Sequence, residues 1–205
     1  EKARTLLSVR SLEGRFGQRY PRGIPYLSHF QAYFLLEDVV SGVSGVLREA
    51  RRPLLAYVHF FPPHEPYRPR AEFADAFHDN WKPVAKPAHV LSVGLSQALL
   101  DTHRTCYDQF IAHMDAEFGR LYDAMRRSGL LRNSYVVITS DHGQLFERGT
   151  HGHVSPFLYE PVIHIPLLIS RPGQTRRRDV RTLTSCVDVL PTLMHLTGKP
   201  VPERY

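Results

Sequence analysis

An α/β fold, in which helices cover the faces of a sheet, is the fold class that this sequence predicts. The clearest observation is an amphipathic helical pattern over residues 96–128 that leads directly into an apolar strand over 135–139, which is half of an α/β unit. A second is the apolar run 54–61, which is short and ends at two prolines, as expected for a buried strand. Ligand sites in such sheets lie beyond the carboxyl ends of strands, so the loops after 61 and after 139 are the first places to look for chemistry.

Apolar side chains that recur at intervals of three and four residues predict the helix over 96–128. They are Tyr107, Phe110, Ile111, Met114, Phe118, Leu121, Tyr122 and Met125. Ser96 is a suitable N-cap, because its hydroxyl can accept a hydrogen bond from a first-turn N–H. Gly129 is a suitable stop, because glycine adopts the left-handed conformation that ends many helices. The sequence therefore predicts both ends of this helix.

Three further elements complete the expected α/β order. A helix is expected near 35–50 and a strand over 163–169, whose proline indicates an edge or a bulge. The last helix is expected to begin at Asp188, because Pro191 then occupies the third helical position, where no N–H is needed, and Gly198 ends it. Asp188 is accordingly predicted to be a helix cap rather than a catalytic residue.

The chain is long enough for one domain, and we expect a single α/β domain over 1–205. Residues 1–28 are polar and aperiodic and are expected to be a lead-in or loop. Residues 62–95 carry six prolines and are expected to be a long active-site loop. Cys106 and Cys186 stand far apart in no metal-type or redox-type spacing, so both are expected to be small hydrophobic residues.

The net charge of +6 permits attraction to anionic small molecules, but the arginines are spread along the chain and nucleic-acid binding is not expected. No stretch approaches the roughly 18–20 apolar residues of a membrane span. The sequence holds no G-x-S-x-G elbow, P-loop or H-E-x-x-H motif, which argues against the usual serine hydrolases, P-loop ATPases and zincin proteases.

Asp141 and His142 directly follow the predicted strand over 135–139 and offer one carboxylate and one imidazole to a metal ion. Two ligands do not make a site, since zinc takes about four ligands and calcium six to eight. The alternative is that Asp141 caps a turn and His142 is an ordinary surface histidine. The spacing alone leaves both interpretations open.

Further histidines flank this pair in the sequence. His64 lies between prolines, which restrict the backbone and present its side chain with little freedom, as suits anion binding or proton donation. His151 and His153 are separated by one glycine and could bind a metal or a substrate. A rigid surface loop with incidental histidines is the competing interpretation of both segments.

Taken in order, these segments resemble the sulfatase family of the alkaline phosphatase superfamily. The resemblance covers about two-thirds of the chain and lies in the ordered set rather than in one motif. The matching segments are 57–67 (YVHFFPPHEPY), the helix over 107–128 with Tyr107 and Asp115, 137–143 (VITSDHG), 152–153, 159–161, 165–169, 172–173, 187–193 and 196–198.

The resemblance implies an alkaline-phosphatase-like sandwich, with a mainly parallel sheet between helices, that hydrolyses sulfate esters with a divalent metal. By analogy Asp141 and His142 would be metal ligands, while His64 and His153 would act catalytically and bind the substrate. His64 would contact the sulfate group, and His153 would lie near the leaving-group oxygen. His151 is a further candidate for substrate binding.

This sequence also departs from the family pattern. Gln144 stands where many relatives have Glu, and neither Cys106 nor Cys186 lies in the Cys/Ser-x-Pro-x-Arg motif whose Cys or Ser becomes formylglycine. The acidic pair that supplies the other metal ligands is also missing. We therefore expect the C-terminal part of a sulfatase catalytic domain, incomplete at the N-terminus and inactive in isolation, with formylglycine only in the missing part.

Several alternatives remain within this resemblance. The chemistry could be that of a phosphodiesterase, a phosphonate monoester hydrolase or a phosphoethanolamine-type transferase, or the domain could be degenerate and non-catalytic. The expected metal is calcium, or manganese or zinc because His142 is a softer ligand than the Asn common at that place. The expected substrate is an anionic small-molecule or carbohydrate sulfate ester, and cellular location is not predicted.

Overall fold

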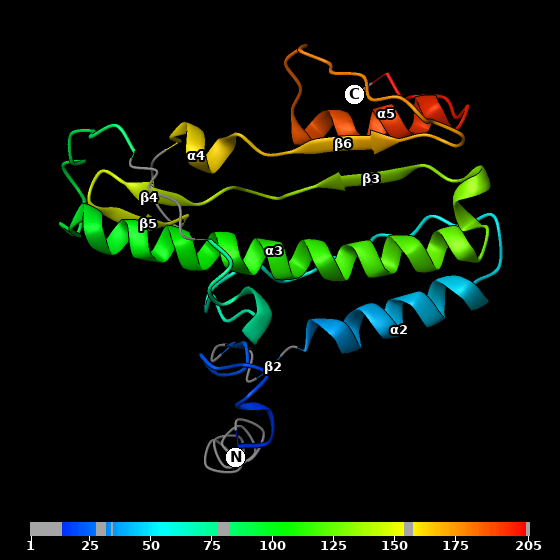
Figure 1. The fold of residues 1–205 in the computed structure, drawn as a ribbon. Coiled ribbons are helices and arrows are strands. Elements are labelled where there is room, and N and C mark those ends of the chain that lie inside the picture. The colour runs from blue at the N-terminus through cyan, green and yellow to red at the C-terminus, as the bar shows by residue number, and fades with distance from the viewer. Residues whose placement is uncertain (1–13, 28–31, 34, 78–82, 154–157, 204–205) are drawn as a thin grey trace.

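The computed structural model describes residues 14–27, 32–33, 35–77, 83–153 and 158–203. The helices are α2 (Leu36–Glu49), α3 (Gln97–Arg127), α4 (Glu160–Ile163) and α5 (Val189–Leu196), and the 3-10 helices are η1 (Ala71–Phe73), η2 (Leu130–Asn133) and η3 (Cys186–Asp188). The strands are β1 (Tyr26–Leu27), β2 (Ala32–Tyr33), β3 (Val136–Thr139), β4 (Leu145–Glu147), β5 (Thr150–Gly152) and β6 (Leu167–Ser170). From top to bottom of Figure 1 the order is α5, β6, β3, α3 and α2.

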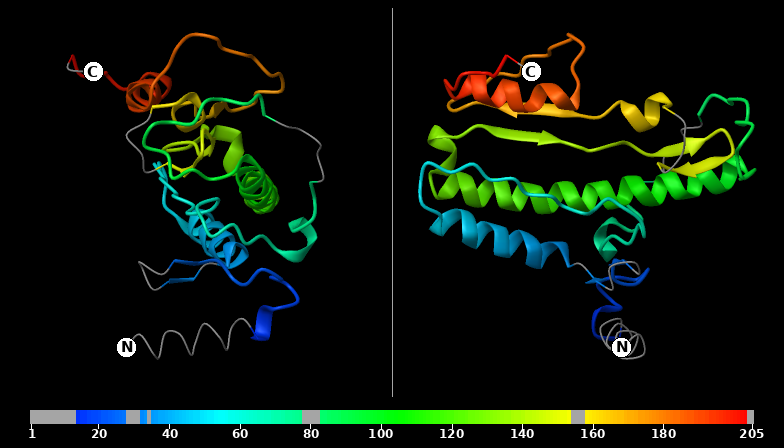
Figure 2. Two further views of the ribbon diagram at one scale, coloured as in Figure 1. Left: turned by 90° about the vertical axis from the view of Figure 1, so that its left-hand side faces the viewer. Right: turned by 180° about the vertical axis from the view of Figure 1, so that it is seen from behind.

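Strands pair in three antiparallel ladders, β1 with β2, β3 with β6 and β4 with β5. The chain leaves β3 toward the β4–β5 hairpin, turns back through α4 and returns along β6, and this reversal makes the β3–β6 pair antiparallel (Figures 1 and 2). The parallel pairing expected for β3 is therefore absent from the described residues. The first three residues of β3 are half-buried, and Thr139 at its end is exposed.

The long helix α3 begins and ends where the sequence predicts. The Ser96 hydroxyl accepts a hydrogen bond from the Leu99 N–H at 3.3 Å, and Gly129 follows the last turn with a φ of +76°. At the C-terminal end of the chain, Asp188 is the N-cap residue of α5, as expected, although its carboxylate accepts a hydrogen bond from the Ser185 N–H instead of from the helix. Capping chemistry thus explains both ends of α3, whereas Asp188 stands at the start of α5 without a side-chain hydrogen bond to that helix.

The apolar core described here lies between α2 and α3. Leu36, Val40 and Leu121 are buried there, and the half-buried hydrophobic side chains around them come mainly from the same two helices. The predicted helix near 35–50 and one face of the predicted helix over 96–128 are therefore confirmed.

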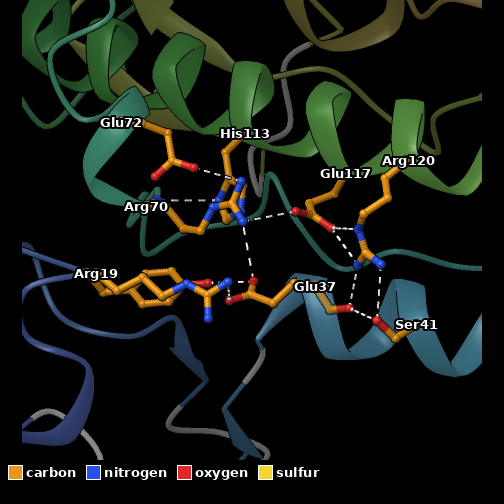
Figure 3. A network of polar contacts seen from close by, with 9 residues as sticks. Arg19, Glu37, Ser41, Arg70, Glu72, His113, Glu117 and Arg120 are labelled. Atoms are coloured by element: carbon orange, nitrogen blue, oxygen red, sulfur yellow. Dashed lines mark hydrogen bonds and ion pairs between the residues drawn. The ribbon is translucent and has the colours of Figure 1, made fainter.

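The buried face of α3 also carries a polar stripe that the apolar pattern did not predict. Gln109, His113 and Glu117 recur every four residues and are buried. His113 is fully buried; its Nδ1 accepts a hydrogen bond from the Arg70 N–H at 3.4 Å, and its Nε2 lies 4.0 Å from a carboxylate oxygen of Glu37 on α2. Figure 3 shows this network between the two helices.

Arginine and tyrosine side chains satisfy the buried carboxylates. Arg19 lies 2.8 Å from Glu37, and the Tyr20 hydroxyl donates to the same carboxylate at 2.7 Å. Glu117 pairs with Arg70 at 3.1 Å and with Arg120 at 2.7 Å (Figure 3). Charges removed from water need such partners, because an unpaired buried carboxylate is strongly destabilising.

The expected buried strand over 54–61 is wrong for this structure. These residues are extended but have no strand partner among the described residues, and Leu55 and Tyr57 are 82% and 86% exposed. An apolar run becomes a strand only where a neighbouring strand offers backbone donors and acceptors, which composition alone does not indicate. Among the helices that the structure describes, none is long and apolar enough to cross a membrane.

Candidate active site

The end of β3 leads into a tight turn that holds Asp141 and His142. The Ser140 hydroxyl donates to the His142 carbonyl at 2.7 Å, and the His142 N–H donates to the Asp141 carboxylate at 2.9 Å. Burial acts to raise the pKa of the Asp141 carboxyl, but the neighbouring His142 and backbone N–H groups outweigh it and hold that pKa below its usual value. The Asp141 carboxylate is thus ionised near neutral pH and 62% exposed, available to a cation.

Gly143 allows α4 to pack directly against this turn. Its N–H donates to the Val162 carbonyl at 2.7 Å, and a Cβ atom at this position would overlap the carbonyl oxygen of Pro161. Only glycine permits so close an approach of two backbone segments. The glycine of the Asp-His-Gly segment therefore has a packing role that places α4 beside the site.

Three histidines from three segments converge beside the turn. The rings of His142 and His153 stack with centroids 3.9 Å apart, and the ring of His64 meets that of His153 edge-on at 5.4 Å. His64 comes from the proline-rich loop and His153 from the residue after β5. The structure thus brings together His64, His142, His153 and Asp141 as predicted neighbours in space.

Each of these histidines is anchored through Nδ1. His142 Nδ1 lies 2.8 Å from the Gly143 carbonyl oxygen, and His64 Nδ1 lies 2.8 Å from the Glu65 carbonyl oxygen. A carbonyl oxygen only accepts, so both Nδ1 atoms carry a proton, and in the neutral form of each ring the lone pair is on Nε2. His153 Nδ1 lies 2.8 Å from the Gln144 side-chain oxygen and repeats the arrangement. This is the orientation that metal-binding and catalytic histidines commonly show.

Gln144 links His153 to a second group of residues that the sequence did not indicate as a unit. Its side-chain nitrogen donates to the Tyr67 hydroxyl at 2.6 Å, and that hydroxyl lies 3.0 Å from His151 Nε2. His151 Nδ1 in turn lies 3.9 Å from the Glu65 carboxylate. His151 therefore lies behind Tyr67, at the far end of this chain of contacts from His153. Tyr67 was visible in the sequence only as the end of the 57–67 segment.

The β4–β5 hairpin places Gln144, His151 and His153 in one group. Arg148 and Gly149 both have positive φ, 58° and 74°, which is the conformation of a two-residue type I′ hairpin turn. The hairpin was missed because the usual Asn-Gly or Asp-Gly signal is replaced by Arg-Gly. The β4–β5 hairpin contacts the loop that precedes α3. The His89 N–H donates to the Arg148 carbonyl at 3.1 Å, and Lys86 pairs with Glu147 at 2.6 Å.

Burial affects the protonation of the titratable side chains here. It lowers the pKa of His153, and the positive charge that His142 and His64 can carry lowers it further. Burial also lowers the pKa of His151, where Glu65 acts in the opposite direction. Burial raises the pKa of Tyr67, whose hydroxyl therefore stays protonated near neutral pH.

Asp141 and His142 fit part of a divalent-metal site. Asp141 Oδ2 and His142 Nε2 lie 3.7 Å apart, and the Nδ1 anchor leaves the Nε2 lone pair available to a cation. Within the described part of the chain, no group of three or more His, Cys, Asp or Glu side chains is arranged to hold a metal ion. The pair supplies ligands of the right chemical types but not a complete coordination shell.

The chain shares extensive similarity with curated sulfatases. Arylsulfatase K of the dog (Canis lupus familiaris) is 38% identical over 101 residues, which cover 49% of this chain and 18% of that protein. The endo-4-O-sulfatase of Bacteroides thetaiotaomicron is 28% identical over 158 residues, or 75% of this chain and 30% of that protein. The chain thus spans less than a third of either relative.

Solved structures show the same fold. The yidJ protein of Bacteroides fragilis, a candidate sulfatase, superposes with a TM-score of 0.66 at 23% identity, over 82% of this chain and 37% of that one. The phosphonate monoester hydrolase of Agrobacterium radiobacter gives a TM-score of 0.65 at 21% identity, over 95% and 47%. The expected alkaline-phosphatase-like α/β fold is confirmed. The Sulfatase family model matches residues 18–199, and the chain belongs to the sulfatase family.

Proposed function

We propose that this chain forms part of the active site of a metal-dependent hydrolase of sulfate esters. The observation that carries the proposal is the convergence of three Nδ1-anchored histidines beside an ionised carboxylate. In the neutral rings their Nε2 atoms can bind a cation or carry a proton, and the similarity to curated sulfatases supports sulfate-ester chemistry for them.

Asp141 and His142 are the proposed metal ligands. When bound, a divalent cation supplies positive charge that offsets negative charge on the transferring group. Calcium would favour Asp141, and manganese or zinc would make better use of His142. The Nδ1 contact of His142 with Gly143 fixes the ring so that Nε2 lies beside the Asp141 carboxylate.

His64 and His153 are the proposed substrate-binding and catalytic residues. His64 would bind a sulfate oxygen through Nε2, and His153 would hold or deliver a proton at the leaving-group oxygen. Their rings meet edge-on, so the two functions would be exerted on neighbouring atoms of one small group. His151 was predicted as a further substrate contact, but its Nε2 is within hydrogen-bonding distance of Tyr67.

The sequence holds no Cys/Ser-x-Pro-x-Arg motif, so we propose that the nucleophile, expected as formylglycine, comes from outside these 205 residues. We likewise propose 1–205 as a single partial domain in which 62–95 is the active-site loop. The expected substrate is a small-molecule or carbohydrate sulfate ester, by analogy with the endo-4-O-sulfatase relative.

The test compares Asp141→Ala with Asp179→Ala in the full-length protein. Both carboxylates are exposed, 62% and 64%, but Asp179 pairs with Arg177 on the surface and serves as the matched control. Asp141→Ala is expected to lower both the bound divalent metal, measured by elemental analysis, and turnover of an aryl sulfate. Unchanged metal content and activity would support a degenerate, non-catalytic domain instead.

The choice of substrate separates the enzyme alternatives. The same preparation is assayed with an aryl sulfate, an aryl phosphodiester and an aryl phosphonate monoester. The proposal expects the highest kcat/KM for the sulfate. A preference for the phosphodiester or the phosphonate would overturn it in favour of phosphoryl chemistry on the same fold.

A further inference from the structure

We propose that Tyr67 and Gln144 are positioning residues that fix the tautomer of His153, through a directed chain of hydrogen bonds whose direction is set by Glu65. The proposal rests on the proposed function only in giving His153 a role at the substrate. The hydrogen bonds run from His151 through Tyr67 and Gln144 to His153, and the Glu65 carboxylate lies 3.9 Å from His151 Nδ1 as a charge contact at the far end.

Two directions of hydrogen bonding are possible in principle along such a chain. In one, Tyr67 donates to His151, Gln144 donates to Tyr67, and His153 donates from Nδ1 to the Gln144 oxygen. In the other, every donor and acceptor is exchanged, Gln144 is flipped, and His153 accepts at Nδ1. Tyr67 has one O–H, so once it donates to His151 it can only accept from Gln144, and that choice fixes the rest of the chain.

Glu65 distinguishes the two directions. A carboxylate only accepts, and it lies 3.9 Å from His151 Nδ1, which favours the proton on that nitrogen. His151 Nε2 is then an acceptor for the Tyr67 hydroxyl at 3.0 Å. That hydroxyl must in turn accept from Gln144 at 2.6 Å, which turns the Gln144 oxygen toward His153.

The surrounding rings hold the chain in place. His103 meets the His151 ring edge-on at 4.6 Å, and Tyr107 meets the Tyr67 ring edge-on at 5.4 Å. The His151 side chain is only 15% exposed, so water competes little for its hydrogen bonds. Hydrogen bonds in such surroundings polarise one another and act together more strongly than separately.

The consequence lies at His153 Nε2. With the proton fixed on Nδ1, neutral His153 presents a lone pair at Nε2, on the ring edge away from Gln144, and it delivers a proton to the leaving group only after Nε2 has itself taken one up. The opposite tautomer would present an N–H there. Tyr67 and Gln144 thereby determine which atom type of His153 meets the leaving-group oxygen, although neither residue is proposed to touch the substrate.

The experiment reads the tautomers directly by NMR of the full-length protein labelled with ¹⁵N in its histidine rings. The His153 and His151 signals are assigned by their loss in His153→Gln and His151→Gln. Wild type is expected to carry the proton on Nδ1 of both residues. Tyr67→Phe breaks the chain in the middle, so the Nε2–H form of His153 is expected to appear.

Gln144→Glu provides a second, distinguishable variant. A carboxylate still accepts from His153 Nδ1, so His153 should keep its tautomer, but it also accepts from Tyr67, whose hydroxyl then no longer donates to His151. The His151 signal should therefore change while that of His153 does not. Tyr57→Phe is the matched control, because Tyr57 makes a 3.0 Å contact with His59 Nδ1 on the exposed 54–61 segment.

An Nε2–H tautomer of His153 in wild type would overturn the proposal. So would an unchanged His153 signal in folded Tyr67→Phe. If Tyr67→Phe does not fold, Gln144→Glu decides, since an unchanged His151 signal contradicts the direction of the chain. None of these readouts needs turnover, so an inactive protein with the expected tautomers would refute the proposed function alone. In an active protein, Tyr67→Phe should lower kcat by about 10–100-fold with little change in KM, as loss of an orienting partner commonly does.

Discussion

Two clusters of polar side chains, the buried network around His113 and the candidate site with its three histidines, use histidine in different ways. His113, in the buried network, is fully enclosed and accepts a hydrogen bond at Nδ1, so its proton lies on Nε2 and faces Glu37. The histidines of the candidate site are half-buried and donate from Nδ1 to carbonyl oxygens, so the lone pair of each neutral ring is on Nε2. The position of the proton and the degree of burial, rather than the residue type, separate a structural histidine from a chemically available one.

The two clusters also treat charge differently. In the buried network every carboxylate lies against an arginine, as Glu117 does against Arg70 and Arg120 (Figure 3). At the site, no ion pair with an arginine or lysine is seen for Asp141 among the described residues, and the His142 N–H, the Ser140 hydroxyl and the side chains of His142 and His59 lie around it. We therefore expect substitutions in the first cluster to change stability and those in the second to change activity.

The largest expected effect is on activity. His153→Gln in the full-length protein removes the proposed proton carrier and should lower kcat for an aryl sulfate by about 10²–10⁴-fold. The free energy of unfolding, measured by urea titration, should change by less than about 1 kcal/mol. His195→Gln, an exposed histidine on α5, is the control and should leave both quantities unchanged. A large loss of stability in His153→Gln would contradict the expectation that substitutions at the candidate site change activity rather than stability.

Glu117→Gln tests the buried network. The change leaves Arg70 and Arg120 without their shared carboxylate, so the free energy of unfolding should fall by about 3–5 kcal/mol. Urea titration followed by circular dichroism measures it. Glu160→Gln, on the exposed side of α4, is the control, and its effect should be within about 0.5 kcal/mol. Equal effects of the two variants would contradict a structural role for the network.

A smaller effect depends on pH. Burial, with Arg70 nearby, lowers the pKa of His113 to about 4, while Glu37, Glu117 and Glu72 act in the opposite direction. The unfolded chain binds this proton below pH about 6.5 and the folded chain does not, so stability is lost as pH falls from about 6.5 to 4.

The lowered pKa of His113 contributes at most about 3 kcal/mol to the pH dependence of the free energy of unfolding. It should appear as the difference between the pH–stability curves of wild type and His113→Gln. His164→Gln is the control, because His164 is exposed and its curve should parallel that of wild type. Parallel curves for His113→Gln would show that His113 is not held neutral.

The smallest expected effect is on the free energy of unfolding, at the Ser96 cap of α3, which belongs to neither the buried network nor the candidate site. Ser96→Ala removes the acceptor for the Leu99 N–H and should lower the free energy of unfolding by about 1 kcal/mol without changing kcat. Ser44→Ala on α2 is the control, because its hydroxyl bonds the Val40 carbonyl, which the helix already satisfies. Thermal denaturation of the two variants should rank Ser96→Ala as the less stable.

Local chemistry made much of the fold predictable. The caps of α3 at Ser96 and Gly129, and the position of Pro191 in α5, follow from neighbouring residues alone and agree with the structure. The strand expected over 54–61 failed because pairing depends on a distant segment. The antiparallel β3–β6 ladder likewise depends on the path of the chain between the two strands.

The candidate site was predictable as a set of residues but not as an arrangement. The ordered motifs identified Asp141, His142, His64 and His153, whose roles remain predictions. Their Nδ1 anchors on carbonyl and amide oxygens, and the link from Gln144 to Tyr67, join residues up to 77 positions apart in the chain. Likewise, the polar stripe of α3 lies inside an apolar pattern, where hydrophobic periodicity gives no sign of buried charge.

A single uninterrupted helix serves both clusters. His103 in the first part of α3 packs against His151, and Glu117 fourteen residues later pairs with Arg70 and Arg120, at a separation of about 21 Å along one helix axis. Because no break divides Gln97–Arg127, the amide protons of its interior should exchange with solvent as one cooperative unit. The part of α3 that supports the candidate site should therefore open with the same free energy as the part that carries the buried ion pairs.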